Sequence, residues 1–151
     1  MNKLIDSTTE DLMAVLHRAA PEEVRDFLRD HFAQGQPTFV QYMDARLEEK
    51  GLKRQTVLLR ADLPQKYGYK LLTGESHTTD RDKLLRILLA MELNLKQTQR
   101  ALRLYGMSEL YPKDPRDVVL IAAICRQQWD VHEISRELTD LGLAPIVPPE
   151  T

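Results

Sequence analysis

Apolar side chains recur along this chain at the three- and four-residue spacing of an amphipathic helix, as in Leu84, Leu85, Leu88 and Met91. Stretches in which apolar and polar residues alternate between hairpin turns, as in a half-buried strand, are absent from the sequence. The spacing therefore predicts an all-α protein. A chain of 151 residues is long enough to bury one substantial core, so we expect one globular domain with short extensions.

Capping residues and glycines predict where nine helices begin and end. Ser7 and Glu10 have the spacing of a capping box for the first helix, and Pro21 suits the first turn of the second. Leu12, Val15, Leu16 and Ala19 are expected to form the buried face of that first helix. The other seven helices are expected at about 38–50, 53–60, 64–73, 79–93, 94–105, 115–125 and 131–141.

The segment VVLIAAIC, residues 118–125, is the one place where a buried strand competes with a helix. Periodicity alone does not separate the two structures in so short an apolar run. Asp114 as a cap and Pro115 in a first turn favour the helix. The Pro-rich end, residues 143–151, is expected to be an extended tail.

Charge is unevenly distributed along the sequence although the formal net charge is only −2. Residues 46–103 hold 13 basic and 7 acidic residues, whereas residues 1–45 and 104–151 each hold 4 basic and 8 acidic residues. Such a separation can steer a polyanion to one surface of a protein. A nucleic acid is therefore a candidate partner for the middle of the chain.

The segment KGLKRQTVLLRADLPQKYGYKLLTGE, followed by TTDRDKLLRILLAMELNL and a further helix, resembles the five-helix helix-turn-helix domain of Cro and phage repressors, the XRE family. The flanking pattern LYPKDPRDVVLIAAI is similar to one found in bacterial helix-turn-helix proteins. The resemblance implies four regions: an N-terminal helical extension (1–37), a helix-turn-helix domain (38–106), a C-terminal helical pair (107–142) and the tail (143–151). It also implies that residues 53–60 brace across the DNA backbone and residues 64–73 enter the major groove.

Two positions in this segment depart from the pattern of the family where the helices cross. The family places a small residue on the bracing helix against a branched apolar residue on the recognition helix, but this chain has Leu58 and Gly68 there. The large and the small side chain have exchanged helices, so the total volume at the crossing is conserved and the exchange is expected to be tolerated. A glycine inside a helix costs about 1 kcal/mol relative to alanine, so the helix at 64–73 is expected to be soft or bent.

If the helix at 64–73 enters a groove, its exposed side chains are the candidates for DNA contact. Gln can bond adenine and Lys can reach the acceptors of guanine, whereas basic residues on the bracing helix would bind phosphates. The alternative is that the same side chains merely solubilise an exposed helix or face a protein. The candidate DNA-binding residues are Lys53, Arg54, Arg60, Gln65, Lys66, Tyr69, Lys70, Thr73 and His77.

Catalysis and metal binding have little support in the sequence. The four histidines are scattered and match no zinc pattern, and no glycine-rich phosphate loop is present. Cys125 lies in an apolar run and is expected to be a buried small hydrophobe. Arg81 and Arg116 each precede an Asp near a helix start and are expected to form ion pairs that hold helices together. We therefore expect no enzyme and no cofactor.

The last predicted helix carries an apolar stripe with two alternative uses. Together with the tryptophan before it, the stripe could form a homodimer surface, as in helix-turn-helix proteins that bind two half-sites. It could equally pack against residues 118–125 of the same chain. The residues concerned are Trp129, Val131, Ile134, Leu138 and Leu141.

Location and function follow as expectations. The N-terminus lacks the pattern of a signal peptide, no apolar run approaches the roughly 20 residues that span a membrane, and one cysteine cannot form an internal disulfide. We expect a cytoplasmic protein, not a membrane protein, that binds double-stranded DNA and regulates transcription. The alternative is a helical adaptor on the same fold that has lost DNA binding and binds a protein partner.

Overall fold

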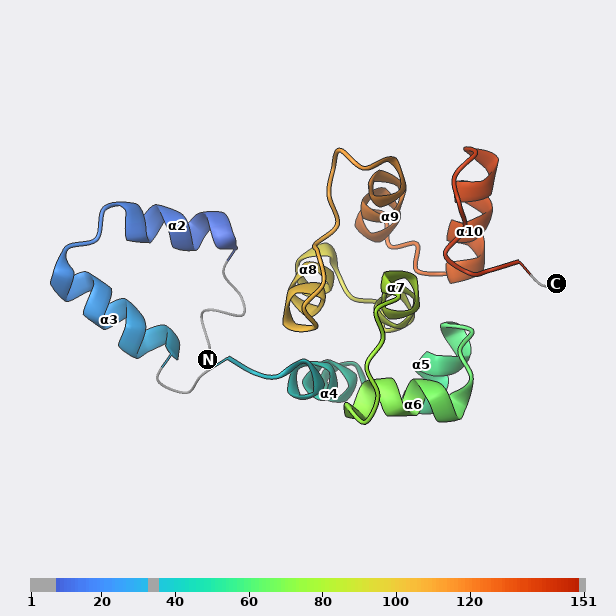
Figure 1. Ribbon diagram of the computed structural model, residues 1–151, viewed down its shortest axis with the longest axis horizontal. Helices are drawn as coiled ribbons and strands as arrows, with labels where there is room; N and C mark the ends of the chain where they lie inside the picture. Colours follow the sequence, from blue (N-terminus) through green and yellow to red (C-terminus); the bar gives the residue numbers. More distant parts are fainter. Residues whose placement is uncertain (1–7, 33–35, 150–151) are drawn as a thin grey trace. The chain divides into compact units, whose positions relative to one another are not determined.

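The computed structural model describes residues 8–32 and 36–149, with the side chains of residues 30–32 excepted. These residues form nine α-helices and no β-strand, so the predicted all-α class is confirmed for the part of the chain that is described (Figure 1). The chain divides into two compact units, Met1–Thr38 and Phe39–Thr151.

The first unit consists of α2 (Thr9–His17) and α3 (Pro21–Phe32). Thr8 caps α2, since its Oγ1 accepts a hydrogen bond from the backbone N–H of Asp11 at 3.0 Å. The predicted cap, Ser7, lies outside the described residues. Val15 and Leu16 were expected on the buried face of α2, but they are 56% and 39% exposed, so the prediction is wrong for these two residues.

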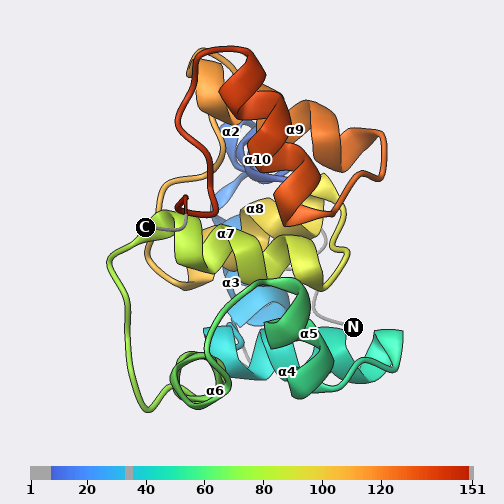
Figure 2. The ribbon, with the colours of Figure 1, turned by 90° about the vertical axis from the view of Figure 1, so that its right-hand side faces the viewer.

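The second unit contains seven helices built around α7 (Figure 2). Residues 84–90 of α7 are all buried, and the helix contacts α5, α8 and α10. Figure 2 shows α7 between the group α4, α5 and α6 and the pair α9 and α10. The helices are α4 (Phe39–Lys50), α5 (Arg54–Arg60), α6 (Gln65–Thr73), α7 (Arg81–Ala90), α8 (Leu95–Leu104), α9 (Pro115–Cys125) and α10 (Val131–Asp140).

Local capping chemistry explains most helix boundaries of this unit. Asn94 and Gln97 form a complete capping box at the start of α8, with hydrogen bonds of 2.8 and 3.1 Å. Asp114 caps α9 and Pro115 occupies its first turn, so the predicted helix in place of a strand is confirmed. Gly74 ends α6 with a φ of 82°, a left-handed conformation that favours glycine.

Helix α9 buries one face and exposes the other. Val119, Leu120, Ala123 and Ile124 are buried, as the apolar run predicts. Cys125, however, is exposed, so its predicted burial is wrong. It lies seven residues after Val118, which is 45% exposed, and helical periodicity therefore turns both side chains to the outer face.

The last helix and the segment after it complete the core. Val131, Ile134 and Leu138 of α10 are 1% exposed or less, and α10 contacts α7 and α9. The segment at 143–149 has no helix, but it is docked: Ile146 is 1% exposed, and the backbone N–H of Val147 donates to Ser135 Oγ at 3.0 Å. Its composition predicted an extended segment but gave no sign of this docking.

Candidate nucleic-acid interface

The helices α5 and α6 are joined by a short turn and packed against each other, with a close contact at Leu58 and Gly68. Leu58 of α5 is completely buried, and a Cβ atom added to Gly68 of α6 would lie 2.3 Å from Leu58 Cδ2. The predicted packing of Leu58 on Gly68 is therefore confirmed. A second link is Gln65 Nε2, which donates to the backbone carbonyl of Gln55 at 3.1 Å.

The outward side of α6 carries the candidate residues expected from the sequence. Gln65, Lys66 and Tyr69 are exposed, and Lys70 and Thr73 are half-buried. The opposite side holds the buried Gly68, Leu71 and Leu72, which attach α6 to the unit. Tyr67 is half-buried, with the ammonium of Lys83 5.0 Å from the centre of its ring.

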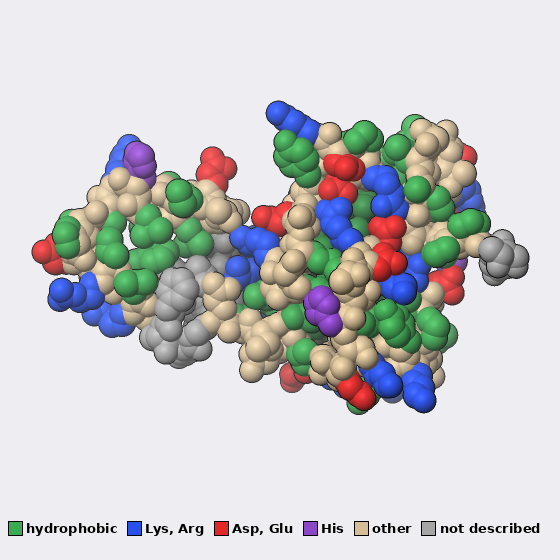
Figure 3. Space-filling view, viewed as in Figure 1, with side chains coloured by type: hydrophobic (Ala, Val, Ile, Leu, Met, Phe, Trp, Pro, Cys, Tyr) green, Lys and Arg blue, Asp and Glu red, His purple; other side chains and the backbone are tan. Residues whose placement is uncertain are grey.

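Lysines dominate the charge on this outward side. Helix α6 contains Lys66 and Lys70 and no acidic residue. Within the described part of the chain, the ammonium of neither lysine has a hydrogen bond or an ion pair, and the same is true of the ammonium of the exposed Lys53 before α5. In the space-filling view, basic side chains lie at the lower edge of the second unit, over α6 (Figure 3). This surface can attract an anion without first breaking an internal pair.

The two arginines of α5 are already engaged. Arg54 Nη2 donates to Asp44 Oδ1 at 2.8 Å, and its guanidinium lies over the ring of Tyr69, 5.6 Å from the centroid. Arg60 forms a longer ion pair of 3.7 Å with Glu92. The acidic partners come from α4 and from the end of α7, so no local pattern in the sequence signals them. Sequence reasoning missed both Asp44 and Glu92.

His77 is held beside the start of α7. Its ring stacks on that of Tyr105 with 4.3 Å between the centroids, and Tyr105 Oη accepts a hydrogen bond from the backbone N–H of Thr78. The carboxylate of Asp80 caps α7 by accepting from the backbone N–H of Asp82 at 3.0 Å. The first turn of α7 is therefore already occupied by a side-chain acid, and the stacked His77 remains exposed.

Two Arg-Asp dipeptides at the starts of α7 and α9 pair with each other. Arg81 donates to both carboxylate oxygens of Asp117 at 2.9 and 3.0 Å, and Arg116 donates to both oxygens of Asp82 at 2.9 Å. The expected structural role of both arginines is confirmed. Arg116 also reaches the carbonyls of Ala144 and Pro145, so this reciprocal clamp binds the C-terminal segment as well.

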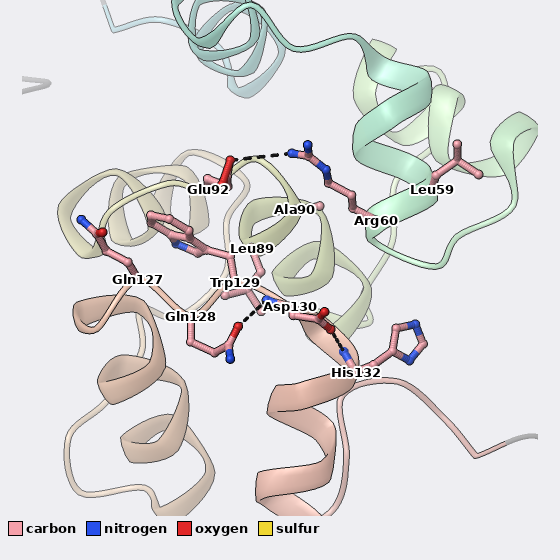
Figure 4. A pocket seen from close by; sticks show the side chains of 10 residues that line it. All are labelled: Leu59, Arg60, Leu89, Ala90, Glu92, Gln127, Gln128, Trp129, Asp130 and His132. Atoms are coloured by element: carbon pink, nitrogen blue, oxygen red, sulfur yellow. Dashed lines mark hydrogen bonds and ion pairs between the residues drawn. The ribbon is translucent and has the colours of Figure 1, made fainter.

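A hollow of about 440 Å³ lies between α5, the end of α7 and the connection from α9 to α10 (Figure 4). Figure 4 shows Arg60 reaching across its upper edge to Glu92, with Trp129 on the side toward α9. The indole N–H of Trp129 donates to the carbonyl of Leu93 at 3.0 Å, which fixes the ring. Leu59, 67% exposed, borders the hollow from α5.

The proposed dimer surface is largely internal. Of its five residues, Val131, Ile134 and Leu138 are buried within the chain and Trp129 is half-buried. Leu141 alone of the five is exposed, at 61%. This burial matches the alternative stated for the stripe, which is packing of α10 within one chain.

Among the described residues, no group of three or more His, Cys, Asp or Glu side chains is placed to hold a metal ion. None of the described helices combines the length and apolar character needed to cross a membrane. No family model matches the sequence, and the chain matches no curated protein and no solved structure.

Proposed function

We propose that this protein binds double-stranded DNA with α6 as the recognition helix and α5 as the bracing helix, and that it regulates transcription by occupying an operator. One observation carries the proposal. The packed pair of α5 and α6 presents Lys66 and Lys70 on an outward side without an acidic residue, and neither ammonium has a partner within the described chain.

The arrangement of the neighbouring helices supports a helix-turn-helix. Helix α6 contacts α4 and α5, and α5 contacts α7, which leaves the side of α6 with Gln65, Lys66 and Tyr69 facing solvent. Gln and Lys side chains on such a helix have the hydrogen-bonding groups that read base edges in the major groove. Lys53 before α5 would contact a phosphate.

Binding of a fluorescent mixed-sequence duplex, followed by anisotropy at several salt concentrations, tests the proposal. The native protein should bind, and its affinity should fall as salt rises, with each phosphate contact adding about −0.9 to the slope of log K against log salt. Changing Lys66 and Lys70 to Glu should weaken binding by about tenfold or more, because two attractions become repulsions.

A matched control has the same change in net charge elsewhere. Lys96 and Lys113 are both exposed and lie outside α5 and α6. Changing both of them to Glu should alter the affinity by less than about threefold. Native protein that fails to bind at low salt, or equal weakening in the two double variants, would remove the support for α6 as a DNA-binding helix.

A protein-binding adaptor on the same fold is the second candidate. It is favoured by the exposed Leu59 of α5 beside the hollow of Figure 4 and by Tyr69 of α6, which is 49% exposed. Exposed large apolar and aromatic side chains are typical of protein-protein contacts. A folded native protein without any affinity for the duplex at low salt would favour the adaptor over the DNA-binding protein.

A further inference from the structure

Arg54 is bound in a different way from the arginines of the clamp. It makes one hydrogen bond to Asp44, through Nη2, and the two side chains are 36% and 46% exposed. Arg81, by contrast, holds both oxygens of Asp117, whose side chain is only 6% exposed, and also two backbone carbonyls. The pair of Arg54 and Asp44 is therefore the weaker and the more easily exchanged of the two.

The guanidinium of Arg54 has unused capacity for an anion. Within the described residues, Nη2 alone of its side-chain nitrogens has a hydrogen-bond acceptor, and the side chain is 36% exposed. A guanidinium can bind an anion with two parallel hydrogen bonds, and a phosphate suits this arrangement. Asp44 therefore satisfies this side chain only in part.

The surroundings of Arg54 form an open groove of about 640 Å³ between α4, α5 and α6. Asp44, Lys53, Gln65 and Tyr69 line it together with Arg54. The ring of Tyr69 lies under the guanidinium, so a cation-π contact keeps Arg54 beside the outward side of α6 when the contact to Asp44 is broken. The groove thus joins the unpaired Lys53 to the surface that we propose faces DNA.

We propose that this groove binds one backbone phosphate of DNA, and that Arg54 exchanges the carboxylate of Asp44 for that phosphate. The inference rests on the proposed DNA binding. Asp44 occupies the guanidinium in the free protein and competes with the phosphate, so it weakens binding to DNA of any sequence. Because a phosphate contact carries no base information, Asp44 lowers the affinity for nonspecific DNA and leaves sequence reading to α6.

The variant Asp44→Asn tests the exchange, because it removes the competing charge and keeps the size of the side chain. Its affinity for a mixed-sequence duplex at low salt should rise about three- to tenfold, and the slope of log K against log salt should steepen by up to about 0.9, as for one more neutralised phosphate. The control Asp140→Asn makes the same change of charge at an exposed position of α10 and should raise the affinity by less than about twofold.

The variant Arg54→Ala completes a double-mutant cycle. Arg54→Ala alone should weaken DNA binding. In that background, Asp44→Asn should raise the affinity no more than Asp140→Asn does, because the carboxylate of Asp44 no longer has the guanidinium of Arg54 to pair with. Circular dichroism and thermal melting of each variant establish that it is folded.

The outcomes separate the two proposals. No binding by the folded native protein overturns both of them. Native binding with equal affinities for Asp44→Asn and Asp140→Asn overturns the exchange alone. A gain from Asp44→Asn that persists in the Arg54→Ala background also overturns it, because the gain then reflects general charge.

Discussion

Gly68 is the residue at which the volume of a single methyl group decides the packing of α5 on α6. Its backbone is helical, so alanine would be acceptable to the main chain and would improve helix propensity by about 1 kcal/mol. The obstacle is Leu58, whose Cδ2 atom would lie 2.3 Å from the new Cβ in a fully buried contact. The two effects oppose each other, and we expect the clash to be the larger because Leu58 is fully buried, so turning its side chain aside requires repacking of its neighbours.

We therefore expect Gly68→Ala to lower the free energy of unfolding by up to about 2 kcal/mol, the cost of overpacking less the gain in propensity. Urea denaturation followed by circular dichroism measures the change. A stabilised Gly68→Ala protein would mean that Leu58 turns aside at no cost.

The partner substitution gives a second prediction at the same contact. Leu58→Ala alone should cost about 2–5 kcal/mol, because it leaves a cavity in the core. In the double variant Leu58→Ala/Gly68→Ala, the added methyl fills part of that cavity. The stability lost in the double variant should therefore be smaller than the sum of the losses measured for the two single variants. Strictly additive losses in the same denaturation assay would contradict a direct contact.

Residue-scale features differ in how far the sequence predicts them. The contact of Leu58 with Gly68 was expected from the resemblance to the helix-turn-helix family, which implies that the two helices cross at these positions. The exposure of Cys125 does not follow from its apolar neighbours, since the buried side of α9 depends on which helices pack against it. The contact of Arg54 with Asp44 joins separate helices and has no local signal.

At the scale of helices, the reciprocal clamp fixes the starts of α7 and α9 to each other. Asp117 is the more critical of its two acids, because its side chain is 6% exposed and also accepts from the backbone N–H of Tyr111. The side chain of Asp82 is 31% exposed, and of the two arginines in the clamp it binds only Arg116. Water can replace part of what Asp82 provides but little of what Asp117 provides.

Asp117→Asn should therefore lower the free energy of unfolding by about 2–3 kcal/mol, and Asp82→Asn by about 1 kcal/mol. Both variants keep the shape of the side chain, so the difference between them reports the combined effect of burial and of the additional hydrogen bond from Tyr111. Chemical denaturation of the two proteins side by side measures it. Equal losses would mean that the two halves of the clamp are equivalent.

The C-terminal segment is a structural element despite its lack of helix. Arg86, 5% exposed, donates to the carbonyl of Ile146 at 3.1 Å, and the side chain of Ile146 is itself 1% exposed. Ile146→Ala should cost about 2–4 kcal/mol, whereas Leu141→Ala, at a 61% exposed position, should cost less than about 0.5 kcal/mol. Thermal melts of the two variants compare a buried side chain of the segment with an exposed one at the end of α10, and matching midpoints would contradict docking.

At the scale of the whole molecule, the three-part charge pattern of the sequence is partly cancelled by folding. Several arginines of the basic middle pair with acids that lie outside it. Arg54 pairs with Asp44, Arg81 with Asp117, and Arg103 lies 3.8 Å from Glu109. Figure 3 shows acidic and basic side chains next to one another on much of the face it draws. Lys66 and Lys70 of α6 and Lys53 before α5 have no acidic partner within the described residues, a grouping that the count of charges alone could not locate.

The division into two units gives a further prediction. The core residues of the second unit, from Phe39 to Ile146, come from within that unit, and its helices form a connected set of contacts. A fragment of residues 39–151 should therefore fold alone, with a thermal midpoint within about 5 °C of that of the whole chain. Calorimetry of the two proteins tests this, and a fragment without a cooperative transition would show that the first unit is required for folding.

Trp129 is the single tryptophan of the sequence, and its indole N–H is bonded to the carbonyl that follows the end of α7. The intrinsic fluorescence of Trp129 therefore reports on the junction between the helix α7 and the connection from α9 to α10. Its emission should shift to the red when α9 and α10 separate from the rest of the unit, even where the helices themselves stay intact. Comparing that signal with circular dichroism during unfolding will tell whether the C-terminal pair leaves first or melts together with the proposed DNA-binding helices.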